Sequence, residues 1–348
     1  REGMAMTIVE STRPITGGVD THLDVHVAAA LDHNGGVLGV ESFPTTPAGY
    51  RDLRDWLVGF GDVERVGVEG TGAYGAGLAR FLQRAGVEVI EVDRPNRQER
   101  RRHGKSDELD AVEAARAALG GRCRAVAKTG DGAMEAMRAL LVAKRSGRQA
   151  RVRSLNQIRH LSFTAPDDLR ARLQPLPTGQ LAAATARLRP SGDVVASATK
   201  LALRTLGRRV LDLDAQLAII DDALAELITA TAPELLALHG VGVDTAAILL
   251  VAAGDNPERI RSEAAWVHLC GVAPIPASSG KVIRHRLNPG GNRQANHALW
   301  RIVMTRMSSD PRTRRYVERR SEEGLTKREI IRVLKRYIAR ETYRHLPR

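Results

Sequence analysis

Lys105-Ser106-Asp107-Glu108-Leu109-Asp110-Ala111 is the stretch that decides the fold, because it predicts a helix that begins with two carboxylates on one face. Ser106 is a helix-capping residue type, and the apolar residues that follow keep helical spacing. Asp107 and Asp110 then lie one turn apart and point the same way. Such a pair is either solvated surface, which the helix dipole favours in a first turn, or half of a site for a hard metal ion.

Two further carboxylates stand at the ends of predicted strands. Residues 15–20 predict a buried strand that ends in Asp20, and residues 63–68 predict a strand that leads into Glu69. Between them, residues 25–31 and 37–43 predict two strands joined by a hairpin turn, and a helix follows from Pro47. A helix around Leu78 and a strand at 87–92 complete the region. A three-strand meander followed by alternating helix and strand predicts an RNase H-like α/β sheet.

This order of elements predicts that the four carboxylates converge. The strand of Asp20 lies beside the strand of Glu69, and the Asp107 helix packs near their ends. Singly, Asp20 is equally well explained as a turn residue and Glu69 as a helix cap. Together they favour a shared site in which carboxylate oxygens hold one or two Mg²⁺ ions, the arrangement that chemistry on a phosphodiester requires. Asp24, in the first hairpin, is a weaker candidate than Asp20.

The chain is strongly basic, with 53 Lys+Arg against 40 Asp+Glu in 348 residues and a formal charge of +13. The excess, concentrated in residues 94–102, 138–159 and 284–348, indicates a polyanionic partner, nucleic acid before membrane. No segment has the apolar length of a membrane span or a signal peptide. Cys123 and Cys270 suggest neither a disulfide framework nor a zinc site, so we expect a soluble protein of the reducing cytosol.

The region after residue 130 is predicted to be mainly helical. Residues 131–161 form an Arg-rich helical pattern, whose one-signed charge favours a polyanion or a dimer partner over plain solvent. A looser, proline-punctuated connection is expected next, followed by a long helix over residues 194–231. The apolar residues of this helix repeat at threes and fours, which indicates a helical hairpin or a coiled coil and therefore self-association.

The last predicted domain starts at Pro233 and contains two groups of motifs. Gly240-Val241-Gly242 joins two apolar helical stretches and predicts a helix-hairpin-helix, whose glycines let backbone N–H groups approach a phosphate. The alternative is an ordinary glycine-rich connection. Further on, Ser278-Ser279-Gly280-Lys281 precedes a cluster of basic residues. Taken alone, such serines more often belong to an ordinary loop than to a nucleophile. Basic helices are expected over residues 312–348.

These motifs, in this order, resemble the insertion-sequence 110 family of DEDD transposases, which are serine recombinases guided by a bridge RNA. The stretches that carry the resemblance are Gly18-Val19-Asp20, Val68-Glu69-Gly70-Thr71-Gly72, Lys105–Ala111, Leu238-His239-Gly240-Val241-Gly242, Gly271-Val272-Ala273-Pro274, Ser279-Gly280 and Gly290-Gly291-Asn292-Arg293. The resemblance implies a RuvC-like RNase H-fold domain at 14–130, a helical coiled-coil linker at 131–232, and a mainly α-helical transposase domain with a helix-hairpin-helix at 233–348.

The resemblance also implies roles for single residues. Asp20, Glu69, Asp107 and Asp110 match the catalytic quartet that binds Mg²⁺, and Ser279, which follows Ser278, matches the nucleophile that forms a covalent phosphoserine–DNA intermediate before strand exchange and rejoining. The residues expected to contact nucleic acid are Gly240, Gly242, Lys281, Arg284, His285, Arg286 and Arg293. The implied partners are donor and target DNA, the bridge RNA, and further copies of the chain in a dimer or tetramer. Whether the active site forms within one chain or between two stays open.

Two other functions remain possible from the sequence. A metal-dependent nuclease of the junction-resolving kind would use the same carboxylates to hydrolyse DNA with water. An actin-like kinase or ATPase also begins with a strand hairpin and a loop such as Gly70-Thr71-Gly72. That class needs a second phosphate-binding Asp-Gly hairpin, which the helical, basic second half does not offer.

Overall fold

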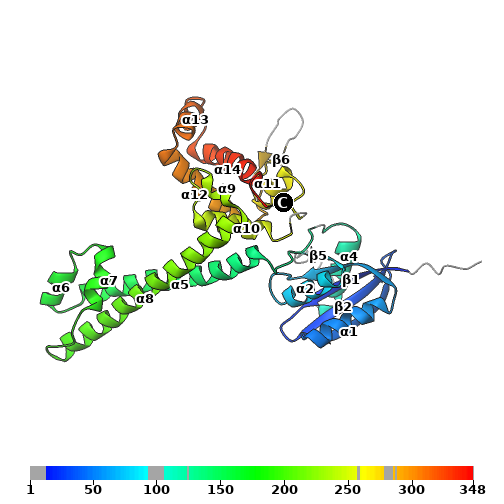
Figure 1. Cartoon of the computed structure of the whole chain (residues 1–348), viewed down its shortest axis with the longest axis horizontal. Coiled ribbons are helices and arrows are strands. Elements are labelled where there is room, and N and C mark those ends of the chain that lie inside the picture. Colours follow the sequence, from blue (N-terminus) through cyan, green and yellow to red (C-terminus); the bar gives the residue numbers. More distant parts are fainter. Residues whose placement is uncertain are drawn as a thin grey trace, which may run out of the picture. The chain divides into compact units, whose positions relative to one another are not determined.

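The computed structural model describes residues 13–92, 106–123, 125–256, 259–277, 285–286 and 288–347 (Figure 1). The contacts divide the chain into two compact units. The first comprises the residues up to Gly132 together with Gly254–Arg259, and the second comprises Ala133–Ala253 and Ile260–Arg348. The three-domain division expected from the sequence stays a prediction.

The first unit is built on a five-stranded sheet with the order β3-β2-β1-β4-β5. Strands β1 (Pro14–Thr21), β2 (Val25–Asp32) and β3 (Val37–Pro44) form an antiparallel meander, and β4 (Asp62–Glu69) and β5 (Glu88–Val92) continue it in parallel with β1. The predicted meander is confirmed, as is the pairing of the strand that carries Asp20 with the strand that carries Glu69. Because β1 and β4 are parallel, their carboxyl ends lie at the same edge of the sheet.

Helices cover both faces of this sheet. Helices α1 (Pro47–Val58) and α2 (Ala76–Arg84) pack on one face, where Val19 and Val68 lie in a core with Leu53 and Leu78. Helix α4 (Asp107–Leu119) packs on the opposite face, where Ala111 and Ala115 contact β2 side chains. Successive side chains of a strand point to opposite faces of the sheet. Because helices cover both faces here, nearly every residue of β1 and β2 is buried.

The second unit contains a long antiparallel helix pair. Helices α5 (Ala133–Phe163) and α8 (Val194–Thr231) run side by side (Figure 1), with Met137 near Leu224 at one end and Ile158 near Leu203 at the other. The apolar repeat of residues 194–231 is therefore used at least partly within the chain, as a helical hairpin. A coiled coil between chains stays a prediction.

The connection between α5 and α8 differs from the loose region expected from its prolines. It forms helices α6 (Asp167–Leu173) and α7 (Thr178–Ala186), which bury Leu169 and Leu181 against the long pair. Pro166 and Pro177 each immediately precede one of these helices. A proline in that position lacks only an N–H that the helix would leave unsatisfied, so it starts a helix rather than preventing one.

The rest of the second unit is a cluster of short helices. It consists of α9 (Pro233–Ala237), α10 (Val243–Ala253), α11 (Glu263–Leu269), α12 (Arg293–Ser309), α13 (Pro311–Glu322) and α14 (Lys327–Tyr343), with a two-stranded sheet of β6 (Ile275–Pro276) and β7 (His285–Arg286). Trp266 is fully buried in its core and donates to the Thr342 hydroxyl at 3.4 Å. Among the described residues, no helix is long and apolar enough to cross a membrane.

One segment from the later sequence belongs to the first unit. The Asn256 amide donates to the Ala127 carbonyl at 3.1 Å, and the Arg259 guanidinium donates to the Val126 carbonyl at 3.1 Å and lies 3.4 Å from Glu91. These contacts tie Gly254–Arg259 to the edge strand β5, where Val126 forms a bridge with Ile90. This return could not be predicted, because apolar periodicity marks single elements and not their partners.

Candidate functional site

The sheet presents the predicted carboxylates on the face that α4 covers. Side chains alternate along a strand, so Asp20 shares the face of Gly18 and Glu69 shares the face of Gly67. A Cβ placed on Gly18 would lie 2.2 Å from the Ala115 nitrogen, and one placed on Gly67 would lie 2.4 Å from the Ala114 oxygen. The backbone of α4 thus rests directly on β1 and β4, which brings its first turn to the edge where Asp20 stands.

The start of α4 is capped as the sequence predicts. The Ser106 hydroxyl accepts a hydrogen bond from the Leu109 N–H at 3.4 Å, and Asp107 is the first helical residue. Asp110, one turn later, is only 6% exposed. The partial positive charge at a helix N-terminus favours both carboxylates there.

Asp20 and Asp107 come together at this edge, with the His22 ring between them. The His22 Nε2 lies 3.1 Å from an Asp20 oxygen and 3.4 Å from an Asp107 oxygen. One ligand atom from each of the three residues lies within 4.8 Å of the other two. This group joins the end of β1 to the first turn of α4, so two elements far apart in the sequence form one small cluster.

The electrostatics of the cluster favour an added cation. Burial raises the pKa of Asp20 above its ordinary value, His22 opposes that rise, and the nearby charges of Asp110 and Asp107 add to it. Asp20 is only 7% exposed, so water screens these charges weakly. Burial is the largest cause of this raised pKa, and a cation bound between the carboxylates would offset the further rise that the Asp110 and Asp107 charges add.

The donor atoms fit a divalent metal ion with a mixed set of ligands. Two carboxylate oxygens and one imidazole nitrogen are available. Ligand atoms on an ion with bonds of about 2.1 Å lie about 3 to 4 Å apart, so the observed spacing needs only a small contraction. Oxygen ligands suit Mg²⁺, whereas an imidazole also suits Mn²⁺. Divalent-metal binding is therefore compatible with this geometry.

The other predicted carboxylates lie outside the three-residue group. Asp110 influences Asp20 through its charge. Glu69 ends β4, where its carbonyl accepts a hydrogen bond from the Thr21 hydroxyl at 2.7 Å. Their roles as metal ligands stay predictions. Asp24 is exposed on the β1–β2 turn and is not a member of the group either.

His22 is the functional candidate that the sequence reasoning missed. It lies just after β1, two residues beyond Asp20. Residues two apart in an extended chain point to the same side, and imidazole is a common metal ligand, so this signal was present in the sequence.

The serine motif of the second unit falls outside the described residues. Ser278, Ser279, Gly280, Lys281 and Arg284 belong to that part of the chain, whereas the strands on either side are described. Ile275 pairs with Arg286 and Pro276 with His285, so the described strands before and after the motif lie side by side. His285 and Arg286 are both exposed.

Two glycine motifs that flank the serines contact each other. A Cβ on Gly291 would lie 2.7 Å from the Gly271 nitrogen, and the Asn292 N–H donates to the Leu269 carbonyl at 2.6 Å. Gly271 and Gly291 both have positive φ angles, 65° and 92°, which favour glycine. Asn292 also caps α12, so Arg293 is fixed as the first residue of that helix, where it is exposed.

Comparison with known proteins gives the same family for both units. Residues 17–164 match the family DEDD_Tnp_IS110, described as a transposase, and residues 232–318 match the one described as "Transposase IS116/IS110/IS902 family". Together these segments cover more than half of the chain. The chain belongs to the IS110 family of transposases.

One curated relative is similar to part of this IS110-family chain. It is the "Insertion element IS110 uncharacterized 43.6 kDa protein" of Streptomyces coelicolor, which is 39% identical over 95 residues. The match covers 27% of this chain and 23% of the relative. The chain thus aligns with less than a quarter of that relative's length.

The predicted glycine turn of this IS110-family transposase connects α9 to α10. Gly240 has a φ of 80° and packs against α12, where an added Cβ would lie 3.3 Å from the Arg306 side chain. Gly242 faces open space, and its N–H donates to the Thr245 hydroxyl at 3.0 Å. A cavity of about 340 Å³ opens beside this turn. The name helix-hairpin-helix for this turn stays a prediction.

Proposed function

We propose that this chain is a DNA transposase that cuts and rejoins strands with a divalent metal ion, Mg²⁺ in the first instance, and a serine nucleophile. The observation that carries the proposal is the meeting of Asp20 and Asp107 at the shared edge of β1 and β4. Carboxylates gathered at one point of an α/β sheet, in a chain of a transposase family, suit metal-assisted chemistry on a phosphodiester. An RNase H-like, RuvC-type assignment for the first unit is part of this proposal.

The quartet would hold one or two ions. Asp20 and Asp107 would supply the two oxygens that already lie close together, and Asp110, in the first turn of α4, and Glu69, at the end of β4, would complete the set. When bound, the ion polarises the phosphate and stabilises the charge that develops on it. His22 either joins the ligands or holds the Asp20 and Asp107 oxygens apart until an ion arrives.

Ser279 would be the nucleophile. Its Oγ attacks the phosphorus of a DNA strand, the bond from phosphorus to one DNA oxygen breaks, and that oxygen receives the serine proton. A DNA hydroxyl of another strand then attacks the phosphoserine, and Oγ regains a proton. The ester keeps the phosphodiester energy that hydrolysis would lose to water. Three exposed side chains near the motif are suited to holding phosphate oxygens: the His285 imidazole and the Arg286 and Arg293 guanidinium groups.

The proposed partners are donor and target DNA, a bridge RNA and further copies of the chain. The excess of basic residues in 138–159 and 284–348 supports polyanion binding. The bridge RNA and a dimer or tetramer rest on the family resemblance. Because the carboxylates and Ser279 belong to different units, the active site could be assembled within one chain or between two chains.

The test is to trap the covalent intermediate. A DNA substrate that stalls rejoining should leave the chain joined to a strand end through phosphoserine, and Ser279→Ala should remove this adduct while DNA binding persists. Ser278→Ala is the matched control and should still form it. If only Ser278→Ala loses the adduct, the nucleophile is one residue earlier. If strands are cut with no adduct in any variant, water is the nucleophile and the chain is a junction-resolving type of metal nuclease.

A further inference from the structure

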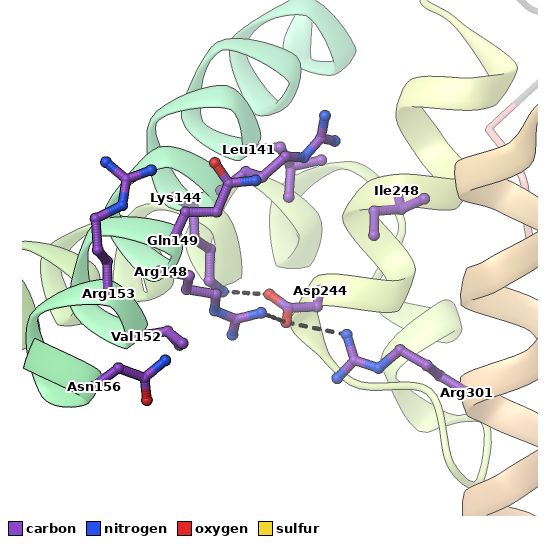
Figure 2. A pocket seen from close by; sticks show the side chains of 11 residues that line it. Leu141, Lys144, Arg148, Gln149, Val152, Arg153, Asn156, Asp244, Ile248 and Arg301 are labelled. Carbon is purple, nitrogen blue, oxygen red and sulfur yellow. Dashed lines mark hydrogen bonds and ion pairs between the residues drawn. The ribbon is translucent and has the colours of Figure 1, made fainter. Parts of the chain in front are cut away.

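A second candidate site lies among α5, α10 and α12, wholly within the helical unit (Figure 2). It is a cavity of about 610 Å³. Two amides and three aliphatic side chains line it together with one acid, Asp244, and five basic residues: Lys144, Arg145, Arg148, Arg153 and Arg301. None of the roles proposed above for the metal or the serine uses these side chains.

Asp244 holds three of the cations in place. Its carboxylate lies 2.8 Å from Arg148 and 3.4 Å from Arg301, and it also forms an ion pair with Lys144 (Figure 2). Burial alone would raise the pKa of Asp244, but its bonds to Lys144 and Arg148 outweigh this and lower it. Asp244 therefore stays ionised and orients cations from α5 and α12 around one point.

The cavity keeps an excess of positive charge after these pairs are formed. Lys144 is buried and also pairs with Asp221, whereas the Arg148 and Arg301 side chains remain 51% and 43% exposed. Within the part of the chain that the structure describes, Arg145 and Arg153 have no ion pair with an acid. An anion that entered would meet up to four arginines, two of them already pre-oriented by Asp244.

The remaining lining suits a nucleotide better than a simple anion. Guanidinium groups match phosphate oxygens with paired hydrogen bonds. Val152 and Ile248 provide an aliphatic surface for a base, and the amides of Gln149 and Asn156 can hydrogen-bond a base edge. We propose that this cavity binds one phosphate and the adjoining base of an unpaired nucleic-acid strand. In a duplex the base is stacked inside, so a base and its phosphate could not enter the cavity together.

The neighbouring cavity favours a strand over a free nucleotide. The 340 Å³ cavity beside the Gly240–Gly242 turn is lined by two residues of the first cavity, Asp244 and Arg301. A strand that passes Arg301 would bring one phosphate to the α5 arginines and another to the turn, where Gly242 leaves open space. This inference rests on the proposed function, because transposition exposes unpaired DNA and a guide RNA supplies unpaired loops.

The test measures binding by the full chain in EDTA, where no strand is cut. The probes are a labelled 12-nucleotide RNA, the DNA of the same sequence, and the corresponding DNA duplex. Arg148→Gln and Arg301→Gln should each weaken unpaired-strand binding by about tenfold, the loss of one charged hydrogen bond, and should change duplex binding less than twofold. The matched control is Arg172→Gln, an exposed arginine of α6 outside the cavity, which should change neither. Whichever of the RNA and DNA probes loses more identifies the natural source of the strand.

A second variant guards against indirect effects on folding. Val152 is 54% exposed, so Val152→Glu should fold normally and still weaken unpaired-strand binding by placing an acid where the base would lie. Three results would each overturn the proposal. The first is unchanged binding in all three variants, and the second is an equal loss of affinity for duplex and unpaired probes. The third is that AMP or UMP, added up to millimolar concentration, displaces the 12-mer fully and binds as tightly as the 12-mer does. This binding measurement is independent of cleavage. A selective loss of affinity for unpaired strands supports the cavity proposal even if no serine adduct forms. Conversely, the serine adduct can form even if the binding results refute the cavity proposal.

Discussion

Gly18 of β1 lies so close to Ala115 of α4 that a Cβ on the glycine would stand 2.2 Å from the Ala115 nitrogen. The contact is backbone to backbone, so neither side can yield by rotating a side chain. It fixes the depth at which α4 packs on the sheet. Two residues further along β1 is Asp20, and two turns earlier along α4 is Asp107, so the same contact determines whether these carboxylates meet.

Gly18→Ala should therefore separate the metal-site residues as well as destabilise the first unit. A methyl group in a closely packed core costs about 1–3 kcal/mol when the surroundings can shift, and here the obstacle is a helix backbone. Urea unfolding should show the loss of stability, and divalent-ion titration should show weaker binding. Gly72→Ala is the matched control, because an added Cβ at Gly72 meets nothing within 4 Å. Equal stability of both variants would mean that α4 does not rest on β1.

Asp20→Asn should stabilise the metal-free chain. Since the pKa of Asp20 is raised in the folded state, its contribution to stability is greatest below the ordinary value of 3.8 and is lost as the pH rises through the raised pKa. Near neutral pH the ionised group costs stability, and the amide removes that cost. We expect the melting temperature in EDTA to rise by about 2–4 °C for each 1 kcal/mol gained.

The same variant should lose the stabilisation that added Mg²⁺ or Mn²⁺ gives the wild type, because one ligand oxygen is gone. Asp24→Asn, in the exposed turn nearby, is the control. It should melt like the wild type in EDTA and should keep the stabilisation by Mg²⁺ or Mn²⁺. A lower melting temperature for Asp20→Asn in EDTA would show that the ionised Asp20, buried beside Asp110 and Asp107, does not cost the folded chain stability.

His22→Ala should change the preference of the site between two metals. If the imidazole is a ligand, its removal should weaken Mn²⁺ binding by about tenfold or more and Mg²⁺ binding much less, because Mg²⁺ gains little from nitrogen. Calorimetric titration of both ions measures the ratio. His33→Ala, at an exposed histidine of the same unit, is the control. An unchanged Mn²⁺ to Mg²⁺ ratio would show that His22 only spaces the carboxylates.

The sheet could be predicted from the sequence because its signals are local. The Asn34-Gly35 turn, the buried apolar runs of β1 and β2 and the Ser106 cap each need only neighbouring residues, and each is found as expected. The adjacency of β1 and β4 followed from the order of elements, since a meander followed by a helix leaves few places for the next strand. The position of the candidate metal site could therefore be predicted, because the strands and the helix that carry its carboxylates could be predicted.

The features that were missed depend on partners distant in the chain. Whether Pro166 ends a helix or begins one is decided by Leu169, which α5 and α8 bury. The return of Asn256 to β5 depends on the Ala127 carbonyl, 129 residues earlier. His22 acquires a role only when Asp107 arrives beside it. Periodicity describes one element at a time, so these relations could not be predicted from it.

Binding of DNA or RNA to the whole chain should weaken steeply with salt. The basic residues of 138–159 and 312–348 displace counterions from phosphates, so the logarithm of affinity should fall linearly with the logarithm of salt concentration, with a slope of about −0.9 per phosphate contact on duplex DNA and about −0.7 on single strands. Fluorescence anisotropy across a KCl series measures it. A flat response between 50 and 200 mM, conditions in which several contacts would cost orders of magnitude, would contradict a backbone-dominated interface.

The last prediction concerns Lys144, a buried lysine between two acids. Lys144→Met keeps much of the side-chain length but leaves Asp244, whose side chain is 13% exposed, to Arg148 and Arg301 alone, while Asp221 lies closer to solvent. Removing one partner of a buried ion pair leaves an uncompensated charge and costs about 3–5 kcal/mol in typical cases; the remaining arginines should hold the loss near the lower figure.

In Lys144→Met/Asp244→Asn the uncompensated carboxylate charge is gone, so the double variant should recover part of the stability. Urea midpoints at neutral pH give the comparison, with Lys200→Met, a half-buried lysine of α8 that donates to Ser191, as the control. If the double variant is less stable than the single one by the full cost of Asp244→Asn alone, Lys144 and Asp244 are not coupled.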